Sequence, residues 1–265
     1  MIETKKSSHL FRGVLLTGLI VAGHSAQAIP VDLELSLVID VSGSVNTDEY
    51  NLQMDGYANA FRDADVQNAI LNGSNGAIAT NVVFFASSAA QGIAFTLLDS
   101  FAAIDAFANQ LDTIARPFGG GTDIFDGVNF AVPLFGDETG GAANGFESTR
   151  QVIDVSGDGR DSVSSNRIAR DNALAGGVDT INGLAIENFP GATLITDFYR
   201  DNVIGGTDAF VETASGFDTF ETAVRNKLRA EIAGPGPTPV PEPATLSLLG
   251  LGFVALRLIR RKKAV

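Results

Sequence analysis

The sequence of 265 residues contains no cysteine and no tryptophan, and its two histidines, His9 and His24, both lie near the start. The absence of cysteine excludes a disulfide framework and a thiolate metal site. The absence of histidine beyond residue 24 excludes a Ser-His-Asp triad, a Cys-His pair and an imidazole zinc ligand from the rest of the chain. These absences remove the commonest nucleophilic and zinc-dependent mechanisms.

The first 28 residues have the pattern of an export signal. A basic start with Lys5, Lys6 and Arg12 precedes a mostly apolar stretch, and Ala26-Gln27-Ala28 provides a small-x-small cleavage site. We expect residues 1–28 to be a signal peptide that is removed, because the apolar stretch is short for a permanent anchor.

The last part of the chain has three segments. Residues 233–243 form a linker rich in proline and glycine, which should be extended. Residues 244–259 are largely apolar and predict a short transmembrane helix, and the positive-inside rule places the basic residues 260–265 in the cytoplasm. Arg257 shortens the uninterrupted apolar stretch to about 13 residues, below the ~20 of a permanent span, which favours a transient anchor.

These C-terminal features resemble a known sorting signal. Val240-Pro241-Glu242-Pro243-Ala244, followed by the apolar segment and Arg-Arg-Lys-Lys, is similar to the PEP-CTERM signal of Gram-negative bacteria. The resemblance implies recognition by an exosortase, a transient stay in the inner membrane and removal of the tail near residues 241–244. It also implies release or attachment at the cell surface, often in bacteria that make exopolysaccharide.

The charge of the chain is strongly negative between these two ends. The 31 acidic and 18 basic residues give −13 overall, but eight of the basic residues and only one acidic residue, Glu3, lie in the terminal segments, so residues 29–243 carry −20. Such a domain repels nucleic acid and favours divalent cations. A well-solvated acidic surface explains most of these carboxylates individually.

The stretch Leu35–Ser44, LSLVIDVSGS, is the centre of the predicted fold. Its apolar run indicates a strand buried on both faces, and it ends in Asp40, Ser42 and Ser44. One carboxylate and two hydroxyls form an all-oxygen ligand set that suits Mg²⁺, Mn²⁺ or Ca²⁺. The alternative is a strand followed by a Ser/Gly turn in which Asp40 caps the next helix.

Strands and helices alternate along the rest of the chain, which predicts a doubly wound α/β sheet. We expect a mostly parallel central sheet flanked by helices, with one antiparallel edge strand. The predicted strands are 35–44 and 151–159 with their polar tips, a possible hairpin pair 76–87 and 92–98, then 180–186 and an edge strand 209–214. The predicted helices are 46–70, 100–111, 123–132, 165–175, 196–203 and 217–232.

Two further motifs carry polar residues at element ends. Gly119-Gly120-Gly121 precedes Thr122, and three glycines allow a backbone to approach a ligand closely, although no P-loop lysine follows. Asp158-Gly159 ends the strand that begins at Gln151. Asp154-x-Ser156-x-Asp158-Gly159 also matches the start of an EF-hand loop, which is disfavoured because Ser165 stands where a bidentate glutamate is required and a strand precedes the motif.

Together, the three motifs resemble the metal ion-dependent adhesion site (MIDAS) in their order and separation, and residues 31–232 resemble a von Willebrand factor type A (VWA) domain of a group of uncharacterised exported bacterial proteins. The resemblance implies a Rossmann-like fold and a metal site. Its ligands would be Asp40, Ser42, Ser44, Thr122 and Asp158. The chain departs from the pattern at Gly157, where a hydroxyl-bearing residue is common. A neighbouring hydroxyl that would support the Asp158 side chain is therefore absent, although the implied role of Asp158 as a ligand is unchanged. Asp123, Asp126 and Asp161 could form an acidic rim, but solvated loop carboxylates are the simpler interpretation.

This resemblance implies a binding protein and not an enzyme. An ion held mainly by neutral oxygens, Mg²⁺ or alternatively Mn²⁺ or Ca²⁺, can accept an acidic group from a protein or exopolysaccharide partner. A metal-assisted hydrolase is the alternative, but the sequence shows no further constellation of acid, base and nucleophile. A structural domain without bound metal is a third hypothesis.

Overall fold

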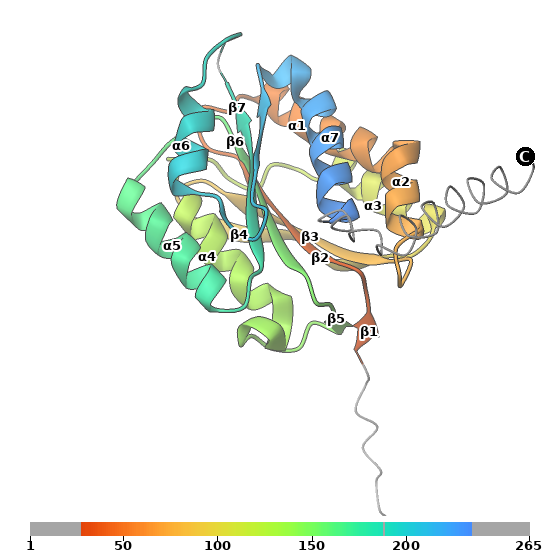
Figure 1. Cartoon of the computed structure of the whole chain (residues 1–265). Helices are drawn as coiled ribbons and strands as arrows, with labels where there is room; N and C mark the ends of the chain where they lie inside the picture. Colours follow the sequence, from red (N-terminus) through yellow and green to blue (C-terminus); the bar gives the residue numbers. More distant parts are fainter. Residues whose placement is uncertain (1–27, 188, 235–265) are drawn as a thin grey trace, which may run out of the picture.

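A seven-stranded sheet forms the centre of the fold. The structure is a computed structural model that describes residues 28–187 and 189–234 (Figure 1). The strand order is β4-β3-β2-β6-β7, and both β8 and β9 pair with β7. Only β4 and β8 are antiparallel to their neighbours, so the predicted α/β class is confirmed. The strands are β2 Glu34–Asp40, β3 Ile78–Phe85, β4 Ala89–Leu98, β6 Gln151–Gly157, β7 Thr180–Ile186, β8 Gly205–Gly206 and β9 Val211–Ala214.

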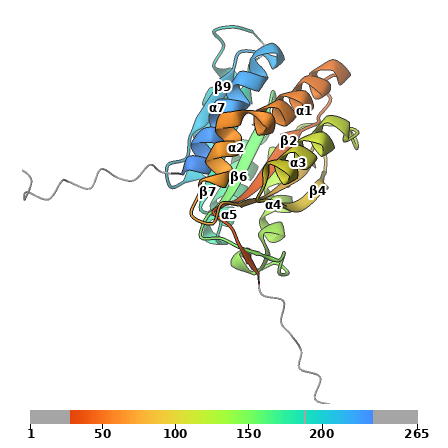
Figure 2. The ribbon, with the colours of Figure 1, turned by 90° about the vertical axis from the view of Figure 1, so that its right-hand side faces the viewer.

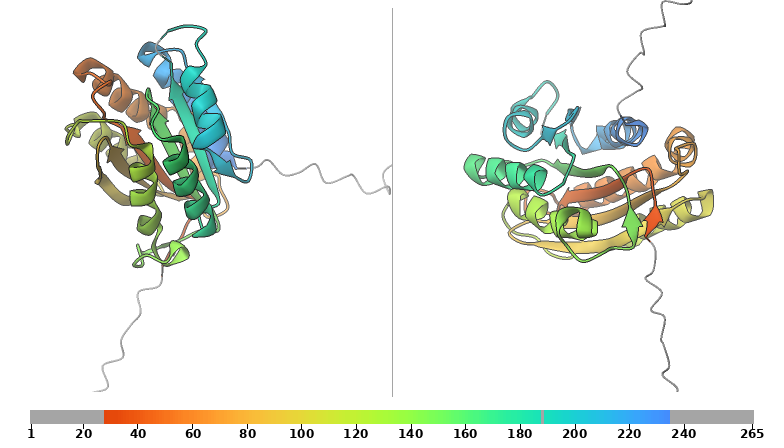
Figure 3. Two further views of the ribbon diagram at one scale, coloured as in Figure 1. Left: turned by 90° about the vertical axis from the view of Figure 1, so that its left-hand side faces the viewer. Right: turned by 60° about the horizontal axis from the view of Figure 1, so that its bottom comes forward.

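Helices cover both faces of the sheet. One layer consists of α1 Thr47–Arg62, α2 Ala64–Leu71, α3 Phe101–Thr113 and α7 Phe220–Ala233. The other consists of α4 Ile124–Ala131, α5 Val163–Ala175 and α6 Leu194–Asn202. Figures 1 and 2 show the first layer on one side of the sheet, and Figure 3 shows the sheet between the two layers. Each layer buries its own apolar cluster against the sheet, as a doubly wound fold requires.

The central strands β2 and β6 are buried along their whole length. Their apolar residues alternate between the two clusters: Leu37 and Ile39 face the α1 layer, whereas Val38 faces the α4 layer. The two strands pair in parallel, with Ile39 opposite Ser156. Their polar tips therefore end side by side at one edge of the sheet.

The predicted helix 46–70 is two helices, which corrects the prediction. α1 begins with a capping box, in which Asn46 accepts from Glu49 N and the Glu49 carboxylate accepts from Asn46 N. At Asp63 the backbone becomes extended, and the Asp63 carboxylate caps α2 by accepting from Asp65 N and Val66 N. An aspartate is a strong N-cap residue, so a second start signal lay inside the periodic pattern.

The edges of the sheet show further differences. The predicted hairpin is present as β3 and β4, and the predicted strand 209–214 is the short parallel strand β9. The two-residue strands β1 Ile29–Pro30 and β5 Phe146–Glu147 pair outside the main sheet, and 3-10 helices span Val132–Thr139 and Phe217–Thr219. β1 and β5 have too few residues to produce a periodic pattern, whereas Phe217–Thr219 lies within the predicted helix 217–232.

Several predicted segments lie wholly or mostly outside the described residues: the signal peptide 1–28, the linker 233–243, the transmembrane helix 244–259 and the basic tail 260–265. Within residues 28–187 and 189–234, no helix combines the length and the apolar character that a membrane crossing needs. The last described helix, α7, runs to Ala233.

Candidate metal centre

Three loops meet at the carboxyl ends of the parallel strands. The loop after β2 follows Asp40, and the loop after the neighbouring strand β6 carries Asp158. The third, the glycine loop Gly119–Gly121, contacts the loop after β2, because Gly43 N donates to Gly120 O at 2.8 Å. Ligand sites of open α/β sheets form at this edge.

All five predicted ligands lie in one hydrogen-bonded cluster. Ser42 N donates to Asp40 Oδ1 at 2.7 Å, and Thr122 Oγ1 donates to Ser42 Oγ at 3.0 Å. The hydroxyls of Ser42 and Ser44 lie 3.0 Å apart, and Ser44 Oγ donates to Asp158 Oδ1 at 2.7 Å. The structure therefore brings together oxygens from three separate parts of the sequence.

Asp40 is completely buried, and its Oδ2 has no hydrogen-bond partner. Burial raises the pKa of Asp40 to about 7, although hydrogen bonds from Ser42 oppose the shift. A buried carboxylate oxygen without a partner carries a desolvation penalty, which a cation nearby would remove. The residues present thus fit a divalent cation.

Asp158 is nearly buried, and its environment explains the departure at Gly157. Burial raises the pKa of Asp158, while the hydrogen bond from Ser44 lowers it. A Cβ on residue 157 would lie 2.7 Å from Asp40 Oδ2 and 2.8 Å from the Tyr199 hydroxyl. Glycine is therefore required here, because the buried hydroxyl of Tyr199, from α6, and the carboxylate of Asp40 already fill the space that a side chain would need.

Arg116 supports the cluster, and the sequence analysis did not identify it. Its guanidinium donates to Val41 O at 2.5 Å and to Ser42 O at 2.6 Å. Its Nε also donates to Phe118 O at 3.2 Å, so Arg116 ties the loop after β2 to the glycine loop. An arginine three residues before the first of three glycines was the available signal, but only the fold shows which carbonyls its guanidinium reaches.

The three nearby aspartates have different roles. Asp161 accepts a hydrogen bond from Ile124 N at 3.0 Å and another from Asn166, so it fixes the start of α4. Asp123 and Asp126 are half-buried, and burial together with the charge of Asp123 raises the pKa of Asp126. Asp161 is therefore a structural residue, whereas the other two contribute negative charge beside the cluster.

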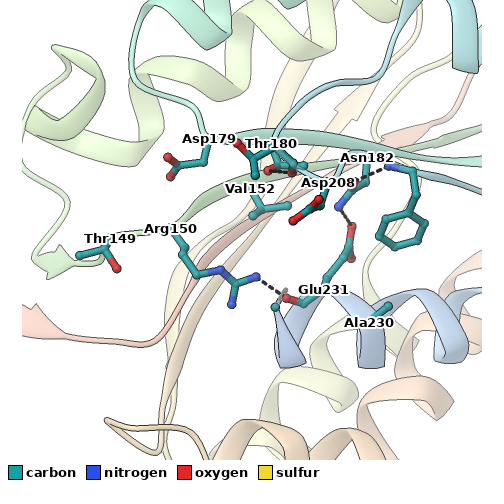
Figure 4. A pocket seen from close by; sticks show the side chains of 12 residues that line it. Thr149, Arg150, Val152, Asp179, Thr180, Asn182, Asp208, Ala230 and Glu231 are labelled. Atoms are coloured by element: carbon teal, nitrogen blue, oxygen red, sulfur yellow. Dashed lines mark hydrogen bonds between the residues drawn. The ribbon is translucent and has the colours of Figure 1, made fainter. Parts of the chain in front are cut away.

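A pocket of about 400 Å³ lies at the amino ends of β6 and β7, at the other end of these strands from the cluster (Figure 4). Arg150 donates there to Glu231 O at 2.5 Å and to Ile232 O at 3.3 Å, which holds the end of α7. Asp154, the first residue of the EF-hand alternative, lies inside β6 and is paired with the buried Lys227 at 2.5 Å. This buried strand position is incompatible with an EF-hand loop.

The cluster offers a cation only oxygen ligands. Across residues 28–187 and 189–234, no group of three or more His, Cys, Asp or Glu side chains is arranged to hold a metal. The cluster instead combines two carboxylates with three hydroxyls. Hard oxygen ligands of this kind suit Mg²⁺, Mn²⁺ or Ca²⁺.

Solved structures with a similar fold include proteins of animals and bacteria. Proximal thread matrix protein 1 from the mussel byssus, solved with a zinc-occupied MIDAS motif, is 19% identical with a TM-score of 0.54, over 78% of this chain and 49% of that one. The pilus adhesin SpaC from Lactobacillus rhamnosus GG is 15% identical with a TM-score of 0.55, over 78% and 31%. The PilB minor pilin from Streptococcus sanguinis is 14% identical with a TM-score of 0.50, over 79% and 64%. The chain therefore spans less than two thirds of each relative, and at these identities the likeness shows the fold alone.

Family comparisons agree with the two resemblances found in the sequence. The PEP-CTERM protein-sorting motif matches residues 239–263. A search of curated proteins found no match. The description "Protein of unknown function (DUF1194)" matches residues 30–236, which cover more than half of the chain. The chain therefore belongs to the DUF1194 family, a VWA-like family, and carries a PEP-CTERM sorting motif.

Proposed function

We propose that this chain is an exported binding protein that uses a divalent cation to hold an acidic group of a partner. The observation that carries the proposal is the buried Oδ2 of Asp40, which has no hydrogen-bond partner although it lies in a cluster of five oxygen-bearing side chains. Such an atom is costly to bury unless a ligand compensates it.

Ser42, Ser44 and Thr122 would hold the ion through neutral oxygens, and Asp40 and Asp158 would act directly or through water. When bound, Mg²⁺ held mainly by neutral oxygens stays electrophilic and accepts a carboxylate oxygen at an open position; Mn²⁺ and Ca²⁺ are alternatives. Arg116 would keep the two loops in place through its contacts with Val41 O and Ser42 O.

The sorting motif supports the location of this activity. A match to the PEP-CTERM motif supports exosortase processing at the inner membrane of a Gram-negative bacterium, followed by exposure at the cell surface or release. The partner would be a protein or an exopolysaccharide, and the negative charge of residues 29–243 argues against nucleic acid. The zinc-occupied MIDAS of the mussel protein supports a cation in this fold.

Calorimetric titration of residues 29–239 with Mg²⁺, Mn²⁺ and Ca²⁺ tests the proposal. We expect one-site binding that is lost in Asp40→Ala and weakened in Ser44→Ala, whose exposed side chain makes misfolding a poor explanation. Asp99→Ala is the matched control, because Asp99 is an exposed carboxylate after β4, away from the cluster. Absence of binding by all three ions to the wild-type protein would refute the proposal.

A further inference from the structure

Lys227 is the one lysine between residues 7 and 261 of the sequence, and it is completely buried in α7. The other nine basic residues of positions 29–243 are all arginines. Arginine is the usual cation of a buried ion pair, because its guanidinium is weakly hydrated and stays charged. A lysine differs chemically, because its amine can lose a proton and then act as a nucleophile. The chain therefore has a potential nucleophile at a position where ion pairing alone would favour arginine.

Two buried carboxylates lie against this amine. Lys227 Nζ lies 2.5 Å from Asp154 Oδ1, on the central strand β6, and it also contacts Glu231 Oε1, one helical turn along α7. The contact with Asp154 is shorter than the ~2.7–2.9 Å of an ordinary hydrogen bond between charged groups. Neither oxygen of Asp154 accepts a hydrogen bond from the part of the chain that the structure describes.

The reacting atoms are close together. A C–O bond is about 1.2 Å long, so Asp154 Cγ lies within about 3.7 Å of Lys227 Nζ. Two atoms that are positioned to react are separated by roughly 3–3.5 Å. The geometry is therefore close to that required for the amine to attack the carboxyl carbon.

The surroundings of the pair exclude water. Asp154 is completely buried, Glu231 is 3% exposed, and the ring of Phe210 lies 5.7 Å from Lys227 Nζ. Asn182 Nδ2 donates to Glu231 Oε1 at 2.8 Å and so holds that carboxylate beside the amine (Figure 4). Burial penalises both charges of an ion pair, whereas an amide is neutral. The interior thus favours a neutral, covalently joined pair over two separate ions.

We infer that Lys227 and Asp154 condense to form an isopeptide bond once the chain has folded. The bond is a covalent modification that joins α7 to the central strand β6. This inference goes beyond the proposed function and does not depend on a bound metal.

The step balances without any further reactant. The amine of Lys227 forms a bond to Asp154 Cγ, a C–O bond of Asp154 breaks, and the released oxygen leaves as water. Of the three protons of the ammonium, one stays on the amide nitrogen and two leave with the water. Burial and the charge of Asp154 raise the pKa of Glu231, so the Glu231 carboxyl can take a proton from Nζ and pass it to the departing oxygen. The pocket in Figure 4, which is lined by Glu231 and Asn182, gives the water a route out.

The position of the bond suits a chain that is held by its tail. α7 is the last described helix, and the match to the sorting motif begins at residue 239. A pull on the tail would reach α7 first and, without a covalent link, would peel this helix from the sheet. The bond would carry the pull directly to β6.

Mass spectrometry of tryptic peptides tests the inference on the full chain, which is incubated overnight, unfolded and digested. Trypsin does not cleave after a lysine whose amine is bonded. We therefore expect residues 151–160 joined to residues 226–229, in a product lighter than the sum of the two peptides by one water. Separate peptides without this product would overturn the inference, and so would a link from Lys227 to Asn182 with loss of ammonia.

Two variants test the roles of the amine and of the neighbouring acid. Lys227→Arg keeps the cation but removes the nucleophile, so the linked product should be absent. Glu231→Gln keeps the shape of the side chain but removes its proton transfer, so the product should form at least about tenfold more slowly. Glu221→Gln is the matched control, because Glu221 is exposed in the first turn of the same helix, and it should not change the rate.

Formation of the product at the wild-type rate in Glu231→Gln would overturn the proton transfer by Glu231. The readout is the mass of the peptides because stability does not discriminate between the two forms of the pair. Lys227→Met leaves Asp154 as an unpaired buried carboxylate whether the pair in the wild-type protein is ionic or covalent.

Discussion

Replacement of Lys227 by methionine should destabilise the fold by about 3–5 kcal/mol. Lys227 of α7 is completely buried, its ammonium lies 2.5 Å from Asp154 Oδ1, and it also donates to Glu231 Oε1. Both carboxylates are buried as well. The methionine would leave two carboxylates in the interior without a cation, and a lost buried partner costs far more than a lost surface pair.

Urea unfolding at pH 7 measures this loss in the free energy of unfolding. In thermal unfolding, the melting temperature should fall by roughly 10 °C, since a domain of this size loses about 2–4 °C per kcal/mol. Burial and the charge of Asp154 raise the pKa of Glu231. Glu231 in the variant should therefore take up a proton on acidification, which would recover part of the loss at pH 5.

Arg229→Met is the matched control for the same helix. Arg229 lies 3.2 Å from Asp65 in a pair in which both side chains are about half exposed or more, so its loss should cost less than about 1 kcal/mol. If Lys227→Met costs no more than Arg229→Met, the idea that the buried ammonium compensates two buried carboxylates is wrong.

Three further predictions follow from the same contacts. Gly157→Ala should destabilise the fold by about 1–3 kcal/mol and weaken Mg²⁺ binding, because the added Cβ would collide with Asp40 and with the Tyr199 hydroxyl; urea unfolding and calorimetry measure the two effects. Arg116→Gln should weaken Mg²⁺ binding severalfold more than Arg116→Lys, which keeps a cation near Val41 O; calorimetry compares them. Burial raises the pKa of Glu34 from 4.5 to about 7, so its contribution to stability is present below pH 4.5 and lost as pH rises through 7. Glu34→Gln should therefore stabilise the fold at pH 8, by up to about 3 kcal/mol, with no gain at pH 4; urea unfolding at both pH values measures it.

The sequence predicted the central strands and the composition of the cluster for a simple physical reason. Apolar runs such as Leu35–Ile39 are long enough to identify buried strands, and parallel strands end at a common edge. Polar residues directly after two such runs must then lie close together. Asp40, Ser42, Ser44 and Asp158 follow such runs, whereas Thr122 follows three glycines and was predicted only from the MIDAS resemblance.

The contacts that hold the cluster could not be predicted from the sequence. Tyr199 belongs to a helix 41 residues after Asp158 in the chain, and its hydroxyl reaches Gly157 only because α6 packs across β7. Arg116 lies on an irregular segment without periodicity. The break at Asp63 was missed because both helices present apolar residues to the same core, so their periodic patterns appeared continuous.

The contact between Arg150 and the end of α7 determines at which end of the sheet the described chain finishes. It places Gly234 at the amino end of β6, and the sorting motif begins only a few residues later, at residue 239. The cluster of candidate metal ligands lies at the carboxyl ends of β2 and β6, about 20 Å away along the seven residues of a strand. A protein anchored to a surface by its tail would therefore hold its binding edge outward, so that a partner could dock from the surroundings without meeting the anchoring surface.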